Sequence, residues 1–322
     1  MFLCSIFLMQ SELSQKILAT IAYYDVSDYP LTVFELWKYL ISNQQSADSD
    51  QKNNKVVIAD IIDALEAEDL KKQVETFRGY YFLPGRIDLV AQRIERDKIS
   101  EEKYRIIRWV VRFLRFVPFV RMILVTGRVA MKNANRKSDL DLLICLEKGR
   151  IFTGRTLVTF TAQLLGRRRH GKKITDRICL NYFITTDSLE IEMQDLFASS
   201  EYSFTLPLFG FDYFQEFQKA NSWIVKYHEN YTPIETPNLK IISDNYFSKL
   251  IRRSGEKMFN FNFLEQKLKT WQTKRIASDL RTKKAGSLIV ANDDSLVFLP
   301  EPQGPKVFEV FKMKMEKLGE KQ

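Results

Sequence analysis

The sequence predicts an α+β protein with a small mixed sheet in the middle of the chain and helices on either side. Two observations predict this fold. Apolar runs of strand length alternate with helical patterns between residues 118 and 200, whereas helical spacing dominates elsewhere. The chain is also long for one domain, with 322 residues of which 45% are hydrophobic. We expect a leader (1–10), a unit of helices and a hairpin (11–88), a linking helix (89–117), the sheet (118–200) and a mainly helical C-terminal region (201–322).

The N-terminal unit is predicted to hold three helices followed by a hairpin. Pro30 ends the first helix, Thr32 caps a second over 33–41, and the third spans 58–68. A polar loop is expected over 42–54, and the hairpin over 73–83 turns at Arg78-Gly79. This order of elements is that of a winged helix, which reads DNA in many proteins and serves only for packing in others. The third helix is acidic and would repel phosphate, so a DNA-binding regulator is the disfavoured alternative.

Charge and cysteine content limit the function classes. Lys and Arg exceed Asp and Glu by 49 to 40, and this excess suits a partner that carries phosphate, such as a nucleotide or nucleic acid. The three cysteines include no CxxC pair, which disfavours a disulfide framework or a zinc site. The apolar opening of the chain is too short to span a bilayer and lacks a signal peptide's features, and Met9 is an alternative start. We therefore expect a cytoplasmic protein without a membrane partner.

The remaining elements follow from apolar spacing. The residues from 89 to 116 predict a basic helix. Strands are expected over 120–126, 140–146 and 177–185, with a short helix over 127–133 and an amphipathic helix over 152–165 between them. The segment 187–283 is expected to be mainly helical, before a hairpin over 287–300 that turns at residues 292–294, and a last helix over 306–318.

The chemistry is expected where the first and second of these strands meet. Gly127 ends an apolar strand, and a glycine turn lets a phosphate come close to backbone N–H groups. Asp139 and Asp141 alternate with apolar residues, so strand periodicity puts both carboxylates on one face. Two adjacent carboxylates repel each other, and a divalent cation relieves that repulsion. Mg²⁺, with Mn²⁺ as the alternative, takes one or two carboxylates together with phosphate oxygens.

This stretch resembles the signature of the polymerase-beta-like nucleotidyltransferase superfamily, in which a glycine turn is followed by Asp-x-Asp between apolar residues. Gly127, Asp139 and Asp141 match it. More loosely, most of the chain is similar to bacterial nucleotidyltransferase-domain proteins, which share a Tyr-Pro-Leu-Thr segment (29–32), a Cys-Leu-Asn-Tyr-Phe strand (179–183) and a helical tail. The resemblance implies a nucleotidyltransferase core in which Asp139 and Asp141 are the catalytic metal ligands. Gly127, Arg128 and Ser138 would then contact the nucleotide.

The chain departs from the superfamily pattern in two ways. Arg128 stands where the family often has a small residue, and it either binds a triphosphate oxygen or fills the pocket. A later strand normally carries a third carboxylate, and Asn181 stands at the expected place. Neutral Asn cannot act as a base, so Asp176 and Asp187, which flank the strand, are the alternatives. The nearby basic run 167–173 is either a solvated loop or a phosphate-binding loop, with Arg167, Arg168 and Lys172 as its candidate contacts.

The leading hypothesis is a Mg²⁺-dependent enzyme that transfers a nucleotidyl group from a nucleoside triphosphate to a hydroxyl acceptor. That acceptor is a small molecule, a protein side chain or an RNA end, and the sequence does not decide among them. A catalytically reduced module of the same fold, which binds nucleotide or docks a partner, is the alternative that Asn181 favours. The excess of basic residues also leaves nucleic acid open as a partner.

Overall fold

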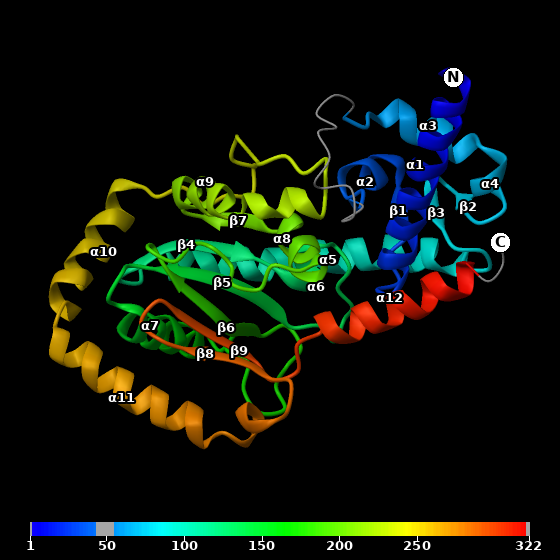
Figure 1. The fold of residues 1–322 in the computed structure, drawn as a ribbon. Coiled ribbons are helices and arrows are strands. Elements are labelled where there is room, and N and C mark those ends of the chain that lie inside the picture. Colours follow the sequence, from blue (N-terminus) through cyan, green and yellow to red (C-terminus); the bar gives the residue numbers. More distant parts are fainter. Residues whose placement is uncertain (1, 43–54, 320–322) are drawn as a thin grey trace.

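The N-terminal part of the computed structural model is a small unit of helices and a short sheet (Figure 1). The structure describes residues 2–42 and 55–319, with side chains described from residue 12 onward. The helices are α1 (Phe2–Asp25), α2 (Val33–Lys38), α3 (Ile58–Glu66) and α4 (Glu68–Lys71). Strands β1 (Leu31–Thr32), β2 (Glu75–Phe77) and β3 (Tyr80–Phe82) form an antiparallel sheet in the order β1-β3-β2.

Local sequence explains how these elements start and stop. The Thr32 hydroxyl accepts from the backbone N–H of Glu35 at 3.3 Å, while the Glu35 carboxylate accepts from the backbone N–H of Thr32 at 2.9 Å, which is a reciprocal cap. Helix α2 ends at Lys38, three residues before the expected position 41. The hairpin turns at Arg78 and Gly79, whose φ angles of 52° and 78° fit the twist of two antiparallel strands. The polar loop expected over 42–54 lies almost wholly outside the described residues.

The expected leader is not separate from this unit. Helix α1 begins at Phe2, so residues 2–10 form its first turns and continue into the segment that packs against the unit. The leader was predicted as a separate segment because Met9 is an alternative start. In the structure one continuous helix runs through that position.

A six-stranded mixed sheet forms the centre of the molecule (Figure 1). Its strands are β4 (Val120–Val125), β5 (Leu140–Leu146), β6 (Ile178–Thr185), β7 (Leu206–Phe209), β8 (Leu288–Ala291) and β9 (Ser295–Leu299), in the order β7-β4-β5-β6-β9-β8. Only β5 and β6 are parallel, and α7 (Ile151–Leu164) connects them. The other pairs are antiparallel. The expected α+β class is therefore confirmed.

Alternate residues of the central strands face two different cores. Leu142 and Ile144 pack with residues of α5 (Asp88–Leu114) and α7 on one side. Leu143 and Cys145 pack on the other side, against residues of α8 (Leu196–Ser203), α9 (Phe211–Ala220) and the 3-10 helix η2 (Ser222–Lys226). Because side chains of a strand alternate between faces, Asp139 and Asp141 belong to the second face.

The sheet also includes strands that lie beyond residue 200, where the sheet segment was expected to end. Strands β7, β8 and β9 all come from the C-terminal region and pair with β4 and β6. β7 is an edge strand, the position in which Pro207 is tolerated. It leads into Gly210, whose φ is 75° and whose missing side chain leaves room for the Arg121 carbonyl oxygen, 1.9 Å from where a Cβ would lie. A distant hairpin completing a sheet cannot be read from local periodicity.

Two long helices and a returning helix complete the chain. Helices α10 (Tyr246–Phe259) and α11 (Asn262–Ser278) run along one end of the molecule, followed by the 3-10 helix η3 (Leu280–Lys283) (Figure 1). Helix α12 (Gly304–Gly319) then crosses back to the N-terminal unit. There Phe311 meets the edge of Tyr23 with ring centroids 5.5 Å apart, and Lys314 pairs with buried Asp25 at 2.5 Å. None of the described helices is both long enough and apolar enough to cross a membrane.

Candidate functional site

The site begins at the glycine turn after β4. Val125 ends the strand, the Thr126 N–H donates to the Asp141 carbonyl at 3.2 Å, and Gly127 starts the short helix α6 (Gly127–Ala130). The φ angle of Gly127 is 62°, which L side chains rarely adopt. A Cβ at this position would lie 2.8 Å from Oδ2 of Asp141. The turn and the second aspartate are therefore in contact, and only glycine fits between them.

The structure brings Asp139 and Asp141 together. A carboxylate oxygen of each and the Sγ atom of Cys179 all lie within 4.8 Å of one another. Burial, and after it the charge of Asp139, raises the pKa of the Asp141 carboxyl to about 7. Two half-buried carboxylates at this spacing form a donor set that a divalent cation fits, because its charge removes the repulsion that raises this pKa.

Cys179, and not Asn181, is the neighbour of this pair on β6. In the parallel pairing Asp141 lies opposite Cys179, and a β-bulge then shifts the register so that Leu143 lies opposite Tyr182. Burial and the nearby Asp141 raise the pKa of the Cys179 thiol to about 12, so it is neutral at physiological pH. A neutral thiol is a poor ligand for Mg²⁺, which prefers oxygen. Sequence reasoning missed Cys179 because a bulge cannot be read from residue spacing.

The flanking aspartates do not supply the third carboxylate. Asp176 accepts a hydrogen bond from the buried ammonium of Lys103 at 2.5 Å. Asp187 lies beyond the opposite end of β6, where it pairs with Lys148. Among the described residues, the group of close ligand atoms around Asp139 and Asp141 contains no third carboxylate.

Arg169 contacts the carboxylate pair directly. Its Nη1 atom donates to Oδ2 of Asp139 at 2.5 Å and to Sγ of Cys179 at 3.3 Å. The residue is held by backbone hydrogen bonds between its segment and the start of β6: Arg169 N–H to the Ile178 carbonyl at 3.0 Å, and Ile178 N–H to the Arg167 carbonyl at 2.7 Å. The basic run therefore reaches the site, through a residue that was not singled out within it.

The other residues that were predicted to contact the nucleotide or its phosphates differ in how exposed they are. Arg128 is exposed next to Gly127, and Lys172 is exposed at the tip of the basic loop. Arg167 and Arg168 are half-buried beside the start of β6. The Ser138 hydroxyl accepts from the Asn135 N–H at 3.0 Å and donates to Asn135 Oδ1 at 3.2 Å, so it holds the loop before Asp139 in shape.

Glu201 adds negative charge from the helical layer that covers this face. Burial, and then Asp195, raises the pKa of this α8 carboxyl to about 7, and its charge contributes to the raised pKa of Asp141. It is not one of the ligand atoms grouped with Asp139 and Asp141. Sequence spacing could not have found Glu201, because a helix far along the chain brings it to the sheet.

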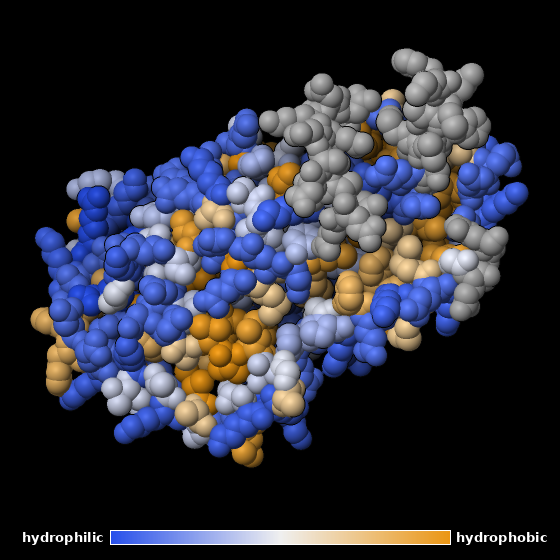
Figure 2. Space-filling model, in the orientation of Figure 1, coloured by the Kyte–Doolittle hydropathy of each residue, from blue (hydrophilic) through white to orange (hydrophobic). Residues whose placement is uncertain are grey.

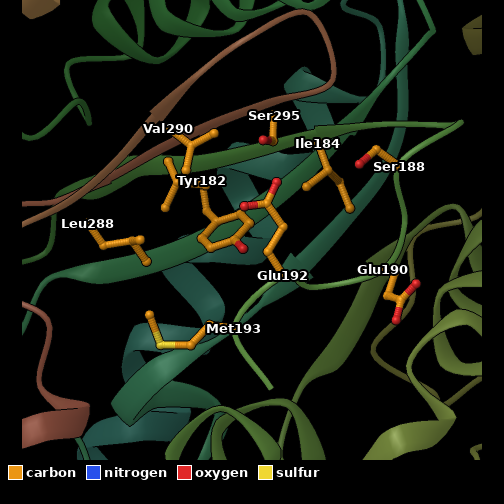
Figure 3. Close-up of a pocket in the computed structure, with 10 residues that line it drawn as sticks. Tyr182, Ile184, Ser188, Glu190, Glu192, Met193, Leu288, Val290 and Ser295 are labelled. Atoms are coloured by element: carbon orange, nitrogen blue, oxygen red, sulfur yellow. The ribbon is translucent and has the colours of Figure 1, made fainter. Parts of the chain in front are cut away.

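A small pocket opens on the same face of the sheet (Figure 3). Tyr182 and Ile184 of β6 and Leu288 and Val290 of β8 form its apolar part, and the side chain of Glu192 lies among them. Because Tyr182 lies opposite Leu143, the pocket faces the same side as the carboxylates. Figure 2 shows apolar side chains gathered in the region where Figure 1 draws β8 and β9.

Comparison of the chain with protein-family models, with curated proteins and with solved structures finds no match in any of the three.

Proposed function

We propose that this protein is a Mg²⁺-dependent nucleotidyltransferase that uses a nucleoside triphosphate. The observation that carries the proposal is the contact of Gly127 with Asp141, in a turn that also places Asp139 beside it. Such a site offers two carboxylates to a divalent cation and an open glycine turn to a phosphate. Arg128 and Arg169 are the nearby cations that suit the remaining phosphate charge.

The reaction needs little covalent chemistry from the protein. The oxygen of the acceptor hydroxyl bonds to the α-phosphorus, the bond from that phosphorus to the β-phosphate bridging oxygen breaks, and pyrophosphate leaves. Mg²⁺, when bound, neutralises the triphosphate charge. The proton of the hydroxyl passes to solvent in this proposal, because the described ligand group holds neutral Cys179 and no third carboxylate to act as a base. Asp139 and Asp141 hold the cation, and Gly127 leaves room for the phosphate.

Label transfer tests this proposal. Purified protein is incubated with α-³²P-labelled nucleoside triphosphates, Mg²⁺ and a panel of hydroxyl acceptors. We expect labelled product from the wild type and none from Asp139→Ala. The control is Asp187→Ala, which removes an exposed aspartate beyond the far end of β6 and should retain transfer. Transfer that survives Asp139→Ala contradicts the proposal.

A second candidate is a nucleotide-binding module of the same fold without turnover. The neutral Cys179 beside the carboxylates and the Arg169–Asp139 ion pair favour it, since the first removes a base and the second occupies a metal ligand. Triphosphate binding that depends on Mg²⁺ and Asp139 without any transfer would identify this alternative.

We propose that the N-terminal unit is a winged helix used for packing, not for reading DNA. The order of its elements supports the fold, and α12 already covers part of it. The exposed face of α3 carries Asp60, Asp63 and Glu66, which would repel DNA phosphates. A salt-dependent shift of duplex DNA by residues of this unit would contradict this assignment.

A further inference from the structure

Three guanidinium groups, those of Arg155, Arg168 and Arg275, lie near enough for their charges to interact, and Arg168 pairs with Ile178, which faces the α7 side of the sheet. Burial, followed by the charges of Arg168 and Arg275, lowers the pKa of Arg155 to about 10. Burial and the charge of Arg275 likewise lower the pKa of Arg168. Arg155 lies on α7 and Arg275 on α11, and these helices pack together. Like charges near one another repel, and an anion would relieve that repulsion.

Among the described residues no ion pair joins Arg155 or Arg168 to a carboxylate, whereas the charge of Arg275 acts on Asp279, which itself pairs with Arg281. Arg155 donates to the amide oxygen of Gln272 at 2.5 Å and lies over the ring of Phe298, while its buried Nε has no hydrogen-bond partner. The nearest acid on α11, Glu265, is committed elsewhere, since it accepts from the backbone N–H groups of Phe152 and Thr153 at 2.9 Å each. Arg155 is thus enclosed by the protein, and exposed Arg275 and half-buried Arg168 are the members of the cluster that an anion from outside the chain can reach.

Exposed aromatic side chains continue this surface along α11. Phe263 is 70% exposed and Trp271 54% exposed. The Lys267 ammonium lies 4.3 Å from the Phe263 ring centre, and the Arg275 guanidinium 5.5 Å from that of Trp271. The two aromatic residues and Lys267 line a shallow groove together with Gln266, Thr270 and Lys274. Aromatic faces alternating with cations are the combination that binds single-stranded nucleic acid, by stacking bases and pairing with phosphates.

The surface leads to the carboxylate pair through the basic loop. The segment 167–169 is extended beside the start of β6, so its successive side chains face opposite ways. Arg168 belongs to the cluster with Arg155 and Arg275, whereas Arg169 contacts Asp139. This extended segment therefore carries one cation on the α7 side of the sheet and the next cation at the carboxylate pair.

We propose that this surface, which we call the α11 track (Arg168, Phe263, Lys267, Trp271, Lys274 and Arg275), binds a single-stranded nucleic acid whose hydroxyl end is the acceptor. The proposal rests on the proposed function and names its acceptor class. An anionic membrane fits less well, because apolar and charged side chains are mixed around α11 and not segregated to opposite faces.

Fluorescence anisotropy of a 5′-labelled single-stranded oligonucleotide tests the track. Arg275→Ala should weaken binding several-fold and reduce the slope of log K against log salt by about 0.7, the value for one phosphate contact on a single strand. Trp271→Ala should weaken binding by about five-fold or more with little change in slope, because stacking is not ionic. The matched controls are Arg253→Ala and Tyr246→Ala, an exposed cation and an exposed aromatic residue on α10, and both should bind as the wild type does.

Three outcomes would contradict nucleic-acid binding by the α11 track. The wild type binds no oligonucleotide, the track variants lose no more affinity than the controls, or Trp271 is needed only for binding to phosphatidylcholine–phosphatidylserine vesicles. Triphosphate binding separates this failure from that of the proposed function. Arg275→Ala should leave Mg²⁺-dependent triphosphate binding unchanged, and Asp139→Ala should leave oligonucleotide binding unchanged. Track-dependent oligonucleotide binding without any triphosphate binding would refute the acceptor role and the proposed function together.

Discussion

Arg169 forms an ion pair with Asp139, its Nη1 atom 2.5 Å from the carboxylate Oδ2. The guanidinium therefore holds one of the two carboxylates that a divalent cation would take. Under the proposed function this site would have two charge states. Arg169 neutralises Asp139 when no metal is bound, and a bound metal with a triphosphate would free the guanidinium to face phosphate.

Removing this competitor should strengthen metal binding. We predict that Arg169→Gln raises Mn²⁺ affinity without nucleotide by about 1.4- to five-fold, since a partly exposed ion pair contributes roughly 0.2–1 kcal/mol. The same variant should weaken triphosphate binding. Electron paramagnetic resonance of free Mn²⁺ measures the first effect, with Arg253→Gln as the charge-matched control. An unchanged Mn²⁺ affinity would show that Arg169 does not compete with the cation.

Substitution of Gly127 tests how tightly the turn and the carboxylate are fitted. In Gly127→Ala the new Cβ meets Oδ2 of Asp141 at 2.8 Å and also stands on a φ of 62°. We expect loss of triphosphate binding and a loss of stability of roughly 1–3 kcal/mol. Gly149→Ala is the matched control, because Gly149 has a φ of 68° but open space at the Cβ position. It should lose about 1 kcal/mol and keep binding. Equal binding losses in both variants would argue against a specific contact.

The raised pKa of Asp141 predicts a pH dependence of two kinds. The pKa of an ordinary Asp is 3.8, and burial followed by the charge of Asp139 raises that of Asp141 to about 7 in the folded chain. Between these two pH values the unfolded chain is ionised and the folded chain is not, so stability falls as pH rises. In metal-free protein Asp141→Asn should therefore raise Tm by roughly 2 °C or more at pH 8 and much less near pH 4. Mg²⁺ binding by the wild type should strengthen as pH rises through about 7, because the cation needs the ionised carboxylate. Scanning calorimetry with EDTA measures the Tm difference, and calorimetry with Mg²⁺ measures metal binding. A Tm difference that does not depend on pH would contradict a raised pKa for Asp141.

His228 predicts a separate acid-sensitive step. It is fully buried between Ser200, with Oγ 3.1 Å from Nε2, and the Tyr39 carbonyl, 3.0 Å from Nδ1. Burial lowers its pKa from 6.5 to about 4, so the folded chain favours neutral histidine. The stability that neutral His228 contributes is fully present above pH 6.5 and is lost as pH falls to about 4. The loss is roughly 3 kcal/mol, at about 1.36 kcal/mol per pKa unit.

The measurement is unfolding by urea between pH 4 and 8. His228→Gln should be less stable than the wild type at pH 7 and lose less stability on acidification. His170→Gln, at the exposed second histidine, should follow the wild type. A wild-type profile that His228→Gln leaves unchanged would show that another group controls the acid response.

The sequence predicted the central elements well because their apolar periodicity is strong. The strand over 140–146 has the predicted bounds, and both aspartates share a face because strand alternation is a local rule. The rest depended on long-range pairing. Pro207 made a strand hard to predict over residues that form edge strand β7. The β8–β9 hairpin begins about 100 residues after β6 and joins the sheet only through tertiary pairing. A bulge placed Cys179 beside Asp141, and the direction of Arg169 followed from bonds to Ile178. None of these features has a sequence period.

Isothermal titration of nucleoside triphosphate tests the central claim most directly. The account predicts that the wild type binds triphosphate only with Mg²⁺ or Mn²⁺, that Asp139→Ala abolishes this binding, and that Asp187→Ala retains it. Wild-type protein that binds no triphosphate with either metal, or Asp139→Ala protein that binds as tightly as the wild type, would contradict it.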